Sequence, residues 1–451
     1  MNNVTQDNYN FKTLNYLGSK FRLIDFIRKN IDETTSECEG VCDLFAGSGC
    51  VSYCLSQSHP VIACDIQEYS HVICKALLNS QDISETEIKN FFRRLRLKSS
   101  GKIMRAFKPL ITIEENAIRD KDLEILADVI EFGSIEVFYK EKSKSKIQTQ
   151  LTETYKNLCL QKLINSKTLI SRYYGGVYFS YKQSVWIDEI LEQIHSKIDL
   201  CKRDVYLAAL LSTVSEITDT VGKHFAQPLK VRDSSGHVKM LVYNKAIKDK
   251  TINVLELYEN WLNKYAKLPK SPFTHRTMQG EALQCLQKMP KYIKTVYADP
   301  PYTREHYSRY YHVLETIVLR DSPNLSTVSI HGKTKISNGI YRQNRFQSPF
   351  CIRSKAPKAF EELFKRTSSA EKNLVLSYSP YDDTKKTHPR VVTIKQLMFF
   401  AETYYNSVKI VSAGQFTHSK LNSSDHFLEA SDEAELLIIC TSPKKVLEKC
   451  H

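Results

Sequence analysis

The chain has 451 residues, of which 42% are hydrophobic and 25% are charged. This length corresponds to two or three domains with sizeable cores, and this composition excludes a disordered chain. Sixty-four Lys and Arg against 50 Asp and Glu give a net charge of +14. That excess favours a polyanionic partner, most often nucleic acid, over the alternative of a generally basic soluble protein.

Cysteine usage and the absence of long apolar runs predict a cytoplasmic protein. No uninterrupted apolar stretch reaches the length of a membrane span, and the N-terminus lacks a secretory signal pattern. Cys42, Cys50, Cys54, Cys64 and Cys74 lie among apolar residues, which indicates buried, reduced thiols. Because no paired Cys/His spacing occurs, we expect no metal site.

An α/β unit is predicted at the start of the chain. An amphipathic helix in residues 11–30 precedes a strand at Gly40–Phe45, a small-residue turn at Ala46–Gly49 and a helix from about Cys50 to Gln57. A second strand, Val61–Cys64, ends at Asp65. This order is typical of a nucleotide-binding α/β unit.

Residues 82–274 have a different character and predict a mostly helical, basic inserted domain. The basic run at 93–108 has no acidic residue, and a helix is expected at 203–221. The basic run contains Arg93, Arg94, Arg96, Lys98, Lys102, Arg105 and Lys108. A solvated helix face explains this run as well as phosphate binding does. The aromatic cluster at 173–181 favours core packing over base stacking.

The α/β pattern resumes after residue 274, so residues 1–81 and 275–451 are predicted to form one split domain. Strands are expected at Thr295–Asp299, Asn373–Tyr378, Val408–Val411 and Glu435–Cys440. Residues 321–358 are rich in Ser, Asn, Lys and Arg and predict a long functional loop.

The glycine turn predicts a nucleoside-cofactor site. Glycines at Gly47 and Gly49, between a strand and a helix, let the backbone approach a ligand. Asp43 precedes the turn, and Asp65 stands where a carboxylate can accept both ribose hydroxyls. No Lys-Ser/Thr follows the glycines, which argues against a P-loop. A nicotinamide cofactor would leave Asp299–Tyr302 unexplained.

Asp299-Pro300-Pro301-Tyr302 follows a predicted strand, where open α/β sheets bind their ligands. The prolines have no N–H, and Pro301 restricts Pro300 to extended conformations. The Asp299 carboxylate and the Pro300 carbonyl can then both accept hydrogen bonds from one NH2 group. Such acceptors stabilise the positive charge that develops on an amine during methyl transfer, while Tyr302 stacks on the ring. A surface Pro-Pro turn is the alternative.

Cationic and aromatic residues alternate after this tetrapeptide. Arg304, Tyr307 and Arg309 are candidates to contact phosphates or an extruded base, although a solvated helix start is also consistent. His306 and His312 are expected to make structural or substrate contacts rather than bind metal.

Taken together, Tyr16-Leu17-Gly18-Ser19-Lys20, Asp43–Gly49 and Asp299–Tyr302 resemble the D12 class of adenine-specific DNA methyltransferases, the Dam-like enzymes. The resemblance is close over residues 11–81 and 275–320, looser over 370–440, and hardly extends into 82–274. It implies a Rossmann-like fold that binds S-adenosylmethionine and methylates the exocyclic amine of adenine.

The resemblance also implies roles by position. Tyr16, Lys20, Asp43 and the turn Phe45-Ala46-Gly47-Ser48-Gly49 would line the methionine end of the cofactor. Asp65 would bind the ribose, and Glu281 would be an acidic cofactor-site residue, although a surface Glu before a helix is equally consistent. Asp299–Tyr302 would hold the target adenine.

These observations predict a site-specific DNA adenine methyltransferase of a restriction-modification or phage-defence system, with residues 82–274 as its target-recognition domain. The expected partners are double-stranded DNA and a companion restriction endonuclease. Flipping adenine out of the duplex costs a few kcal/mol, which pocket contacts offset. Two alternatives stay open: a different amine acceptor, such as RNA, and an inactive DNA-binding relative, which the intact Asp299 and glycine turn disfavour.

Overall fold

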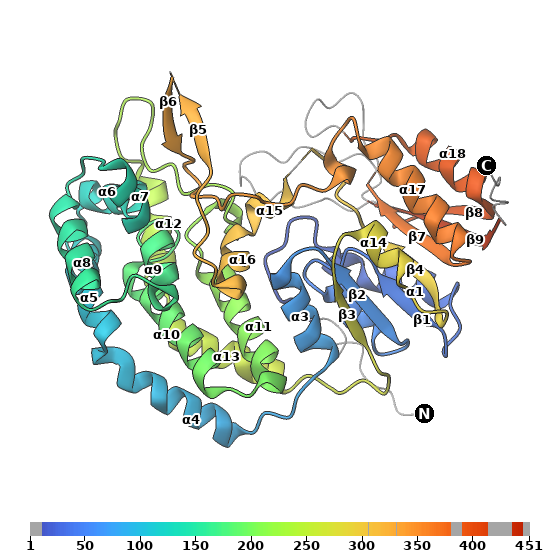
Figure 1. The fold of residues 1–451 in the computed structure, drawn as a ribbon, viewed down its shortest axis with the longest axis horizontal. Helices are drawn as coiled ribbons and strands as arrows, with labels where there is room; N and C mark the ends of the chain where they lie inside the picture. The colour runs from blue at the N-terminus through green and yellow to red at the C-terminus, as the bar shows by residue number, and fades with distance from the viewer. Residues whose placement is uncertain (1–10, 305, 331, 380–389, 414–434, 445–451) are drawn as a thin grey trace. The chain divides into compact units, whose positions relative to one another are not determined.

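The chain divides into two compact units in the computed structural model, which describes residues 11–304, 306–330, 332–379, 390–413 and 435–444 (Figure 1). The α/β unit comprises Met1–Ser80, Pro269–Ser308 and Phe346–His451, and the helical unit comprises Gln81–Leu268 and Arg309–Arg345. The segment Arg309–Arg345 therefore belongs to the helical unit, whereas sequence analysis assigned it to the split α/β domain.

A seven-stranded sheet forms the centre of the α/β unit, in the order β3-β2-β1-β4-β7-β9-β8. β3, β2, β1, β4 and β7 pair in parallel. β9 is antiparallel to both β7 and β8, so β9 alone runs opposite to the other six strands. The strands are β1 (Gly40–Asp43), β2 (Val61–Asp65), β3 (Arg276–Gln279), β4 (Ile293–Ala298), β7 (Asn373–Tyr378), β8 (Tyr405–Ser412) and β9 (Leu436–Pro443).

This topology confirms the predicted Rossmann-like class. From β1 the strand order proceeds outward through β2 and β3, and it then reverses through β4 and β7. The reversal lies between β1 and β4, and ligands of open α/β sheets bind in the crevice outside the carboxyl ends of such strands. Asp43 ends β1, and Asp299 directly follows β4. The topology therefore brings two predicted site residues to the crevice.

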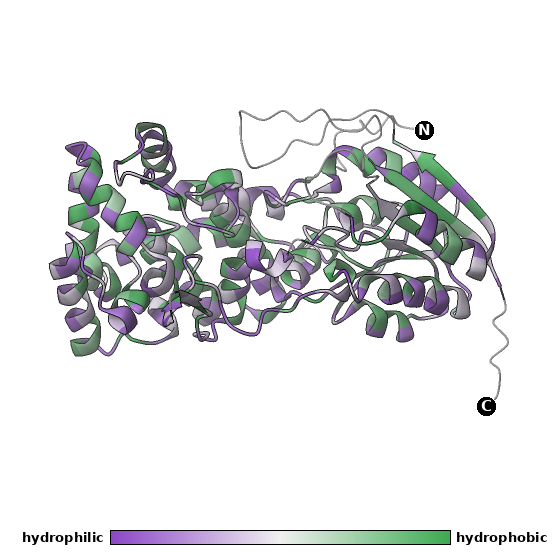
Figure 2. Ribbon diagram, turned by 90° about the horizontal axis from the view of Figure 1, so that it is seen from above, coloured by the Kyte–Doolittle hydropathy of each residue, from purple (hydrophilic) through white to green (hydrophobic). Residues whose placement is uncertain are grey.

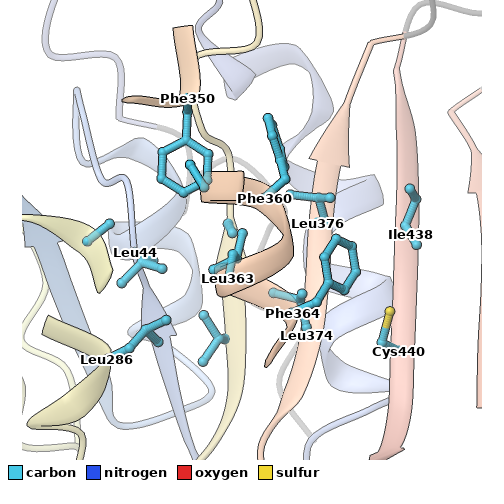
Figure 3. Packing of buried hydrophobic residues seen from close by; sticks show 14 of the residues in the cluster. Leu44, Leu286, Phe350, Phe360, Leu363, Phe364, Leu374, Leu376, Ile438 and Cys440 are labelled. Atoms are coloured by element: carbon cyan, nitrogen blue, oxygen red, sulfur yellow. The ribbon is translucent and has the colours of Figure 1, made fainter. Parts of the chain in front are cut away.

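Helices cover both faces of the sheet because its buried strands are apolar on both sides. On one face, α1 (Ile24–Asp32) and α2 (Cys50–Leu55) pack on residues such as Val41 and Val61. The helix α3 (Glu68–Leu78) contributes to the same core. On the other face lie α14 (Ala282–Gln287), α17 (Ala356–Ser369) and α18 (Ile394–Tyr404). Figure 3 shows Phe360, Leu363 and Phe364 of α17 against the sheet.

The predicted elements of the α/β unit are confirmed with small changes at their ends. The strand β7 has the predicted bounds, and β1 ends two residues before Phe45 because the chain leaves the sheet at Leu44. The five cysteines that sequence analysis singled out are buried thiols, as expected.

The helical unit consists mainly of amphipathic helices with apolar residues on their inner faces (Figure 2). Its helices begin at recognisable caps: Ser84 and Glu87 form a reciprocal capping box at α4, and Ser180 and Gln183 form another at α10. Its longer helices are α4 (Glu85–Arg96), α5 (Lys102–Arg119), α6 (Leu123–Phe132), α7 (Ile135–Glu141), α8 (Gln148–Leu160), α9 (Leu169–Tyr174), α10 (Tyr181–Lys197), α11 (Leu200–Ile217), α12 (Met240–Lys250), α13 (Val254–Ala266) and α16 (His312–Leu319).

The aromatic cluster at 173–181 belongs to the core of the helical unit, as favoured from sequence. Tyr173, Tyr174, Tyr178, Phe179 and Tyr181 are all at most 3% exposed. The Tyr178 hydroxyl lies 3.0 Å from the carbonyl oxygens of both Phe225 and Gly339 and can donate its proton to either, so its polar atom is satisfied inside the unit. These rings therefore stabilise the fold and are not available for stacking on bases.

The segment 321–358 is not a continuous loop. It contains a two-stranded antiparallel hairpin, β5 (Thr327–Ile330) and β6 (Lys333–Ile336), and it ends in the start of α17. β-branched and polar residues alternate in Thr327–Ile336, and such residues form favourable side-chain pairs across the two strands of a hairpin. Sequence analysis missed this two-residue period because the segment as a whole is polar.

Candidate active site

An open cavity with an empty volume of about 930 Å³ lies in the α/β unit at the carboxyl ends of β1, β2 and β4. Ten of the residues that sequence analysis singled out line it: Tyr16, Lys20, Phe45, Asp65, Glu281, Asp299, Pro300, Pro301, Tyr302 and Tyr307.

The glycine turn forms the wall behind this cavity. Gly47 and Gly49 have φ values of +52° and +74°, a region that residues with a Cβ rarely adopt. A Cβ on Gly47 would lie 2.9 Å from the Tyr16 ring, so the turn also needs glycine for space. Within this turn only Phe45 lines the cavity, and the contribution of Ala46, Gly47, Ser48 and Gly49 is to shape the turn behind it.

Asp43 lies beneath the turn and is 1% exposed. Its Oδ2 accepts a hydrogen bond from the Ser52 hydroxyl at 2.6 Å, whereas its Oδ1 is buried without a hydrogen bond in the described part of the chain. Burial raises the pKa of Asp43 to about 7, against the lowering effect of Ser52. The Phe45 backbone amide also lowers the pKa of Asp43, and Asp43 is not among the residues that line the cavity.

Asp65 ends β2 and is fixed by two backbone amides. Gly47 donates to its Oδ2 at 2.8 Å, and Gln67 donates to its Oδ1 at 2.9 Å. The Asp65 side chain also lines the cavity. Burial raises the pKa of Asp65, and the two amide bonds oppose that rise. The side chain is thus held in one orientation at the cavity wall.

Glu281 both caps a helix and lines the cavity. It is the N-cap of α14, where its carboxylate accepts the Gln284 backbone N–H at 3.1 Å, and it also lines the cavity. A capping carboxylate retains a second oxygen for other contacts.

The tetrapeptide Asp299–Tyr302 leaves the sheet at the end of β4 and forms one side of the cavity. The Tyr302 ring packs at 5.0 Å from the Tyr378 ring, measured between centroids. The Lys20 ammonium lies 5.5 Å and the Arg390 guanidinium 4.8 Å from the centroid of the Tyr302 ring. Tyr302 is therefore held by packing and by cation–π contacts, which preserves a defined stacking surface.

Lys20 contacts two carboxylates. Its Nζ lies 2.9 Å from Asp299 Oδ1 and 3.3 Å from Glu435 Oε1, and its side chain is 5% exposed. Burial acts to lower the pKa of Lys20, but Asp299 and Glu435 outweigh it and raise that pKa above its usual value. The ammonium therefore stays charged, and it occupies one oxygen of Asp299.

The charge state of Asp299 is set by opposing effects. Burial raises its pKa to about 6, the Lys20 ammonium lowers it, and the Glu435 carboxylate raises it again. Asp299 is therefore ionised above neutral pH and binds a proton in mildly acidic solution.

Arg304 and Arg309, two of the predicted nucleic-acid contacts, do not line the cavity. Arg304 is exposed on the α/β unit, whereas Arg309 is half-buried in the helical unit, 5.5 Å from the Tyr310 ring centroid. His306 shares a hydrogen bond with the Phe346 carbonyl at 3.1 Å, and His312 shares one with the Phe225 carbonyl at 3.2 Å. Both histidines therefore make structural contacts.

The other predicted contacts, Arg93, Arg94 and Arg96, are exposed in the last turn of α4 in the helical unit. The remaining cations of the 93–108 run are exposed too, on η3 (Leu97–Ser100) and α5. Arg96 pairs with Glu259 at 3.4 Å, whereas Arg93 and Arg94 form no ion pair within the part of the chain that the structure describes.

Sequence analysis missed several cavity residues because they come from segments without a motif. Phe346, Ser348 and Cys351 line the cavity from η6 (Pro349–Cys351) and the residues before it. Ile66, Gln67 and Tyr69 follow Asp65, and their position after a strand that ends in an acid could have indicated them.

The helices that the structure describes include none that combines the length and hydrophobicity of a bilayer-spanning segment. Within the same residues, no group of three or more His, Cys, Asp or Glu side chains is arranged to hold a metal ion.

Residues 16–168 match the family described as D12 class N6 adenine-specific DNA methyltransferase. The chain is also similar to Modification methylase LlaI of Lactococcus lactis subsp. lactis, at 23% identity over 427 residues, covering 94% of this chain and 54% of that protein. Type II methyltransferase M.FokI of Planomicrobium okeanokoites is 25% identical over 374 residues, covering 81% and 44% of the two chains. Modification methylase StsI of Streptococcus sanguinis is 24% identical over 372 residues, again covering 81% and 44%.

These similarities correct one expectation. The family match continues past Ser80 through the first helices of the helical unit to Thr168, so the resemblance does extend into the residues after 81. It does not include Asp299–Tyr302, whose interpretation depends on the cavity. The chain spans about half the length of the curated relatives it matches.

Proposed function

We propose that the chain is a D12 class N6 adenine-specific DNA methyltransferase, which transfers a methyl group from S-adenosylmethionine to the N6 amine of adenine in DNA. The match of residues 16–168 to that family supports the proposal. The observation that carries this proposal is that Asp65 and Asp299–Tyr302 line one and the same cavity of the α/β unit.

The residues around the glycine turn fit S-adenosylmethionine. The closeness of Gly47 to Tyr16 keeps side chains out of the turn. Asp65 would accept from the ribose hydroxyls, and Tyr16, Lys20, Phe45 and Glu281 would line the remainder of the site. When bound, the cofactor supplies an electrophilic methyl group on a sulfonium.

The tetrapeptide would hold the acceptor amine. With Oδ1 of Asp299 occupied by Lys20, its Oδ2 and the Pro300 carbonyl are the acceptors that remain for the two N–H bonds. The lone pair of an exocyclic amine is delocalised into its ring, and two fixed acceptors favour the geometry in which that pair becomes nucleophilic. They also stabilise the positive charge that appears on nitrogen. Tyr302 would stack on the flipped base.

The helical unit would bind the duplex around the target base. The exposed cations of residues 93–108 support this role, because basic side chains on a solvent-facing helix surface can neutralise phosphates. Arg304, Tyr307 and Arg309 would contact the DNA near the flipped adenine.

The double substitution Arg93→Gln/Arg94→Gln is expected to weaken duplex binding and to reduce the slope of log K against log salt by about 2, since each phosphate contact contributes about 0.9. Fluorescence anisotropy of a labelled duplex at several salt concentrations measures both quantities. Arg119→Gln is the matched control, because Arg119 is equally exposed but is already paired with Asp120 at 2.9 Å. An unchanged slope in the double variant contradicts a phosphate-binding role for α4.

The names of the relatives support a restriction-modification context. LlaI and StsI are named modification methylases, and M.FokI is named a type II methyltransferase. We propose the corresponding role here: methylation of a specific DNA site, with a companion restriction endonuclease that cuts the same site when it is unmethylated.

The direct test combines an assay in solution with sequencing. Purified protein with radiolabelled S-adenosylmethionine is offered duplex DNA, single-stranded DNA and RNA in separate reactions. Plasmid from cells that make the protein is then sequenced with detection of modified bases. N6-methyladenine at one recurrent sequence supports the proposal. Label that enters RNA, or cytosine in place of adenine, contradicts the proposed acceptor.

A further inference from the structure

A second buried carboxylate, Glu435, lies in the ion cluster of the active site. Asp299 follows β4, and Glu435 immediately precedes β9, which is two strands away in the sheet. The Lys20 ammonium contacts both, at 2.9 Å and 3.3 Å. Glu435 is completely buried, whereas Asp299 is 20% exposed and lines the cavity. A ligand in the cavity can therefore contact Asp299, while Glu435 acts only through Lys20 and through its charge.

The fold holds Glu435 in this position from two sides. The Ser377 hydroxyl on β7 donates to its Oε1 at 2.6 Å, and the Ala413 amide donates to its backbone carbonyl at 3.1 Å. Ser377 itself is fully buried within the sheet. A buried carboxylate is costly unless it is paired and hydrogen-bonded, and this one has both an ammonium and a hydroxyl as partners.

We propose that Glu435 is a positioning residue for amine methylation: it anchors Lys20 so that only one oxygen of Asp299 is occupied, and it gives the cluster an excess negative charge. This inference rests on the proposed function. It extends that function by assigning a role to a residue that does not touch the substrate.

The charge of the cluster explains why the second carboxylate matters. Two carboxylates and one ammonium carry a net charge of −1, whereas Asp299 and Lys20 alone would be neutral. An amine under attack gains positive charge, which a net negative site stabilises and a neutral pair does not. Without Glu435, the ammonium would also be shared less and would withdraw more electron density from the Asp299 oxygen that faces the amine.

The inference predicts the direction in which the pH dependence of the methylation rate changes. The negative charge of Glu435 raises the pKa of Asp299, so its neutralisation must lower that pKa. The acid limb of the rate profile, where Asp299 becomes protonated, then moves to lower pH even though the plateau rate falls. The charged and titratable groups around Asp299 are Lys20, Asp43, Tyr297, Tyr302, Arg390 and Glu435. Glu435→Gln alters one of them alone.

The kinetic test compares Glu435→Gln with the wild type from pH 5 to pH 9. The variant is expected to lose about 10- to 100-fold in kcat, a loss typical of a removed electrostatic contribution, with KM for DNA nearly unchanged. Its acid limb is expected at lower pH. Glu435→Asp keeps the charge and should retain the wild-type limb with an intermediate rate. Glu402→Gln, at an exposed position on α18 of the same unit, is the matched control.

A second measurement does not depend on activity. Protein labelled with ¹³C at the aspartate carboxyl carbons is titrated by NMR, and the Asp299 resonance is identified by its loss in Asp299→Asn. The Asp299 pKa is expected to fall in Glu435→Gln relative to the wild type. If the wild type methylates no nucleic acid but the titration shifts, the proposed function fails and the ion cluster stands.

Two results overturn the inference. One is a Glu435→Gln enzyme with wild-type kcat. The other is a Glu435→Gln enzyme with a lower kcat but an acid limb in its original place, which shows a merely structural role. If Glu435→Gln does not fold, Ser377→Ala is the variant to test, because it removes the hydrogen bond to Glu435 without changing the charge. That variant is expected to lose several-fold in kcat, and an unchanged rate contradicts the role of Glu435.

Discussion

Asp299→Ala is expected to lower the rate of methyl transfer by about 1,000-fold or more, while the affinity for duplex DNA changes less than about threefold. The substitution removes the acceptor that faces the target amine, so the developing positive charge loses its nearest counter-charge. DNA affinity depends mainly on phosphate contacts elsewhere, which this change leaves in place. Single-turnover methylation and fluorescence anisotropy measure the two quantities.

Two further variants make this result interpretable. Asp299→Asn keeps the shape of the side chain but loses its charge, and it should be nearly as inactive as the alanine variant. Asp25→Ala, at an exposed position in the first turn of α1, should behave as wild type. Because Lys20 loses one partner in both Asp299 variants, their folded state is checked by thermal unfolding. Substantial methylation by a folded Asp299→Ala protein would remove Asp299 from the mechanism.

Lys20→Met is expected to destabilise the protein by about 3–5 kcal/mol and to abolish methylation, because it leaves two buried carboxylates without their shared ammonium. Methionine is close to lysine in length, so lost packing contributes little. Urea unfolding followed by circular dichroism measures the stability. Lys409→Met, at a position 62% exposed with a 3.8 Å ion pair, is the control and should change stability by less than about 1 kcal/mol.

The pH dependence of the Lys20→Met penalty has a definite sign. Burial raises the folded-state pKa of Asp299, and removing the ammonium removes the effect that opposes this rise. A carboxyl group whose folded-state pKa is raised stabilises the folded state at pH values below its unfolded pKa. This contribution to stability disappears as the pH rises through the folded-state pKa. The penalty is therefore expected to be smaller at pH 5 than at pH 8, and adding Glu435→Gln should restore part of the lost stability. A penalty that is equal at both pH values would contradict the ion-cluster interpretation.

The ion cluster links the stability of the α/β unit to its proposed chemistry. Lys20 comes from η2 (Lys20–Leu23), Asp299 from the end of β4 and Glu435 from the start of β9, so the cluster joins three segments far apart in the sequence. Replacing such a cluster by apolar residues would often cost little stability. Its retention of buried charge is consistent with a functional requirement at the amine-binding position.

Short-range patterns predicted most of the α/β unit. The apolar runs at Val61–Cys64 and Asn373–Tyr378 could only be buried strands, and the glycines after β1 required a turn with positive φ. The basic run at 93–108 predicted exposed cations, which follow from the cost of burying charge. In these cases the controlling interactions lie within a few residues of one another, so the local sequence contains the information.

The sequence by itself determined the class of fold and the turn around Gly47, because each depends on backbone sterics and residue type over a few positions. The amine-binding role of Asp299–Tyr302 stays a prediction from the same kind of local pattern. Only the tertiary structure decided that Glu435 joins Lys20 and Asp299, that Arg309–Arg345 belongs to the helical unit, and that Phe346–Cys351 completes the cavity. Those contacts depend on which strands pair and how distant segments pack, and no local periodicity encodes the pairing of β9 between β7 and β8.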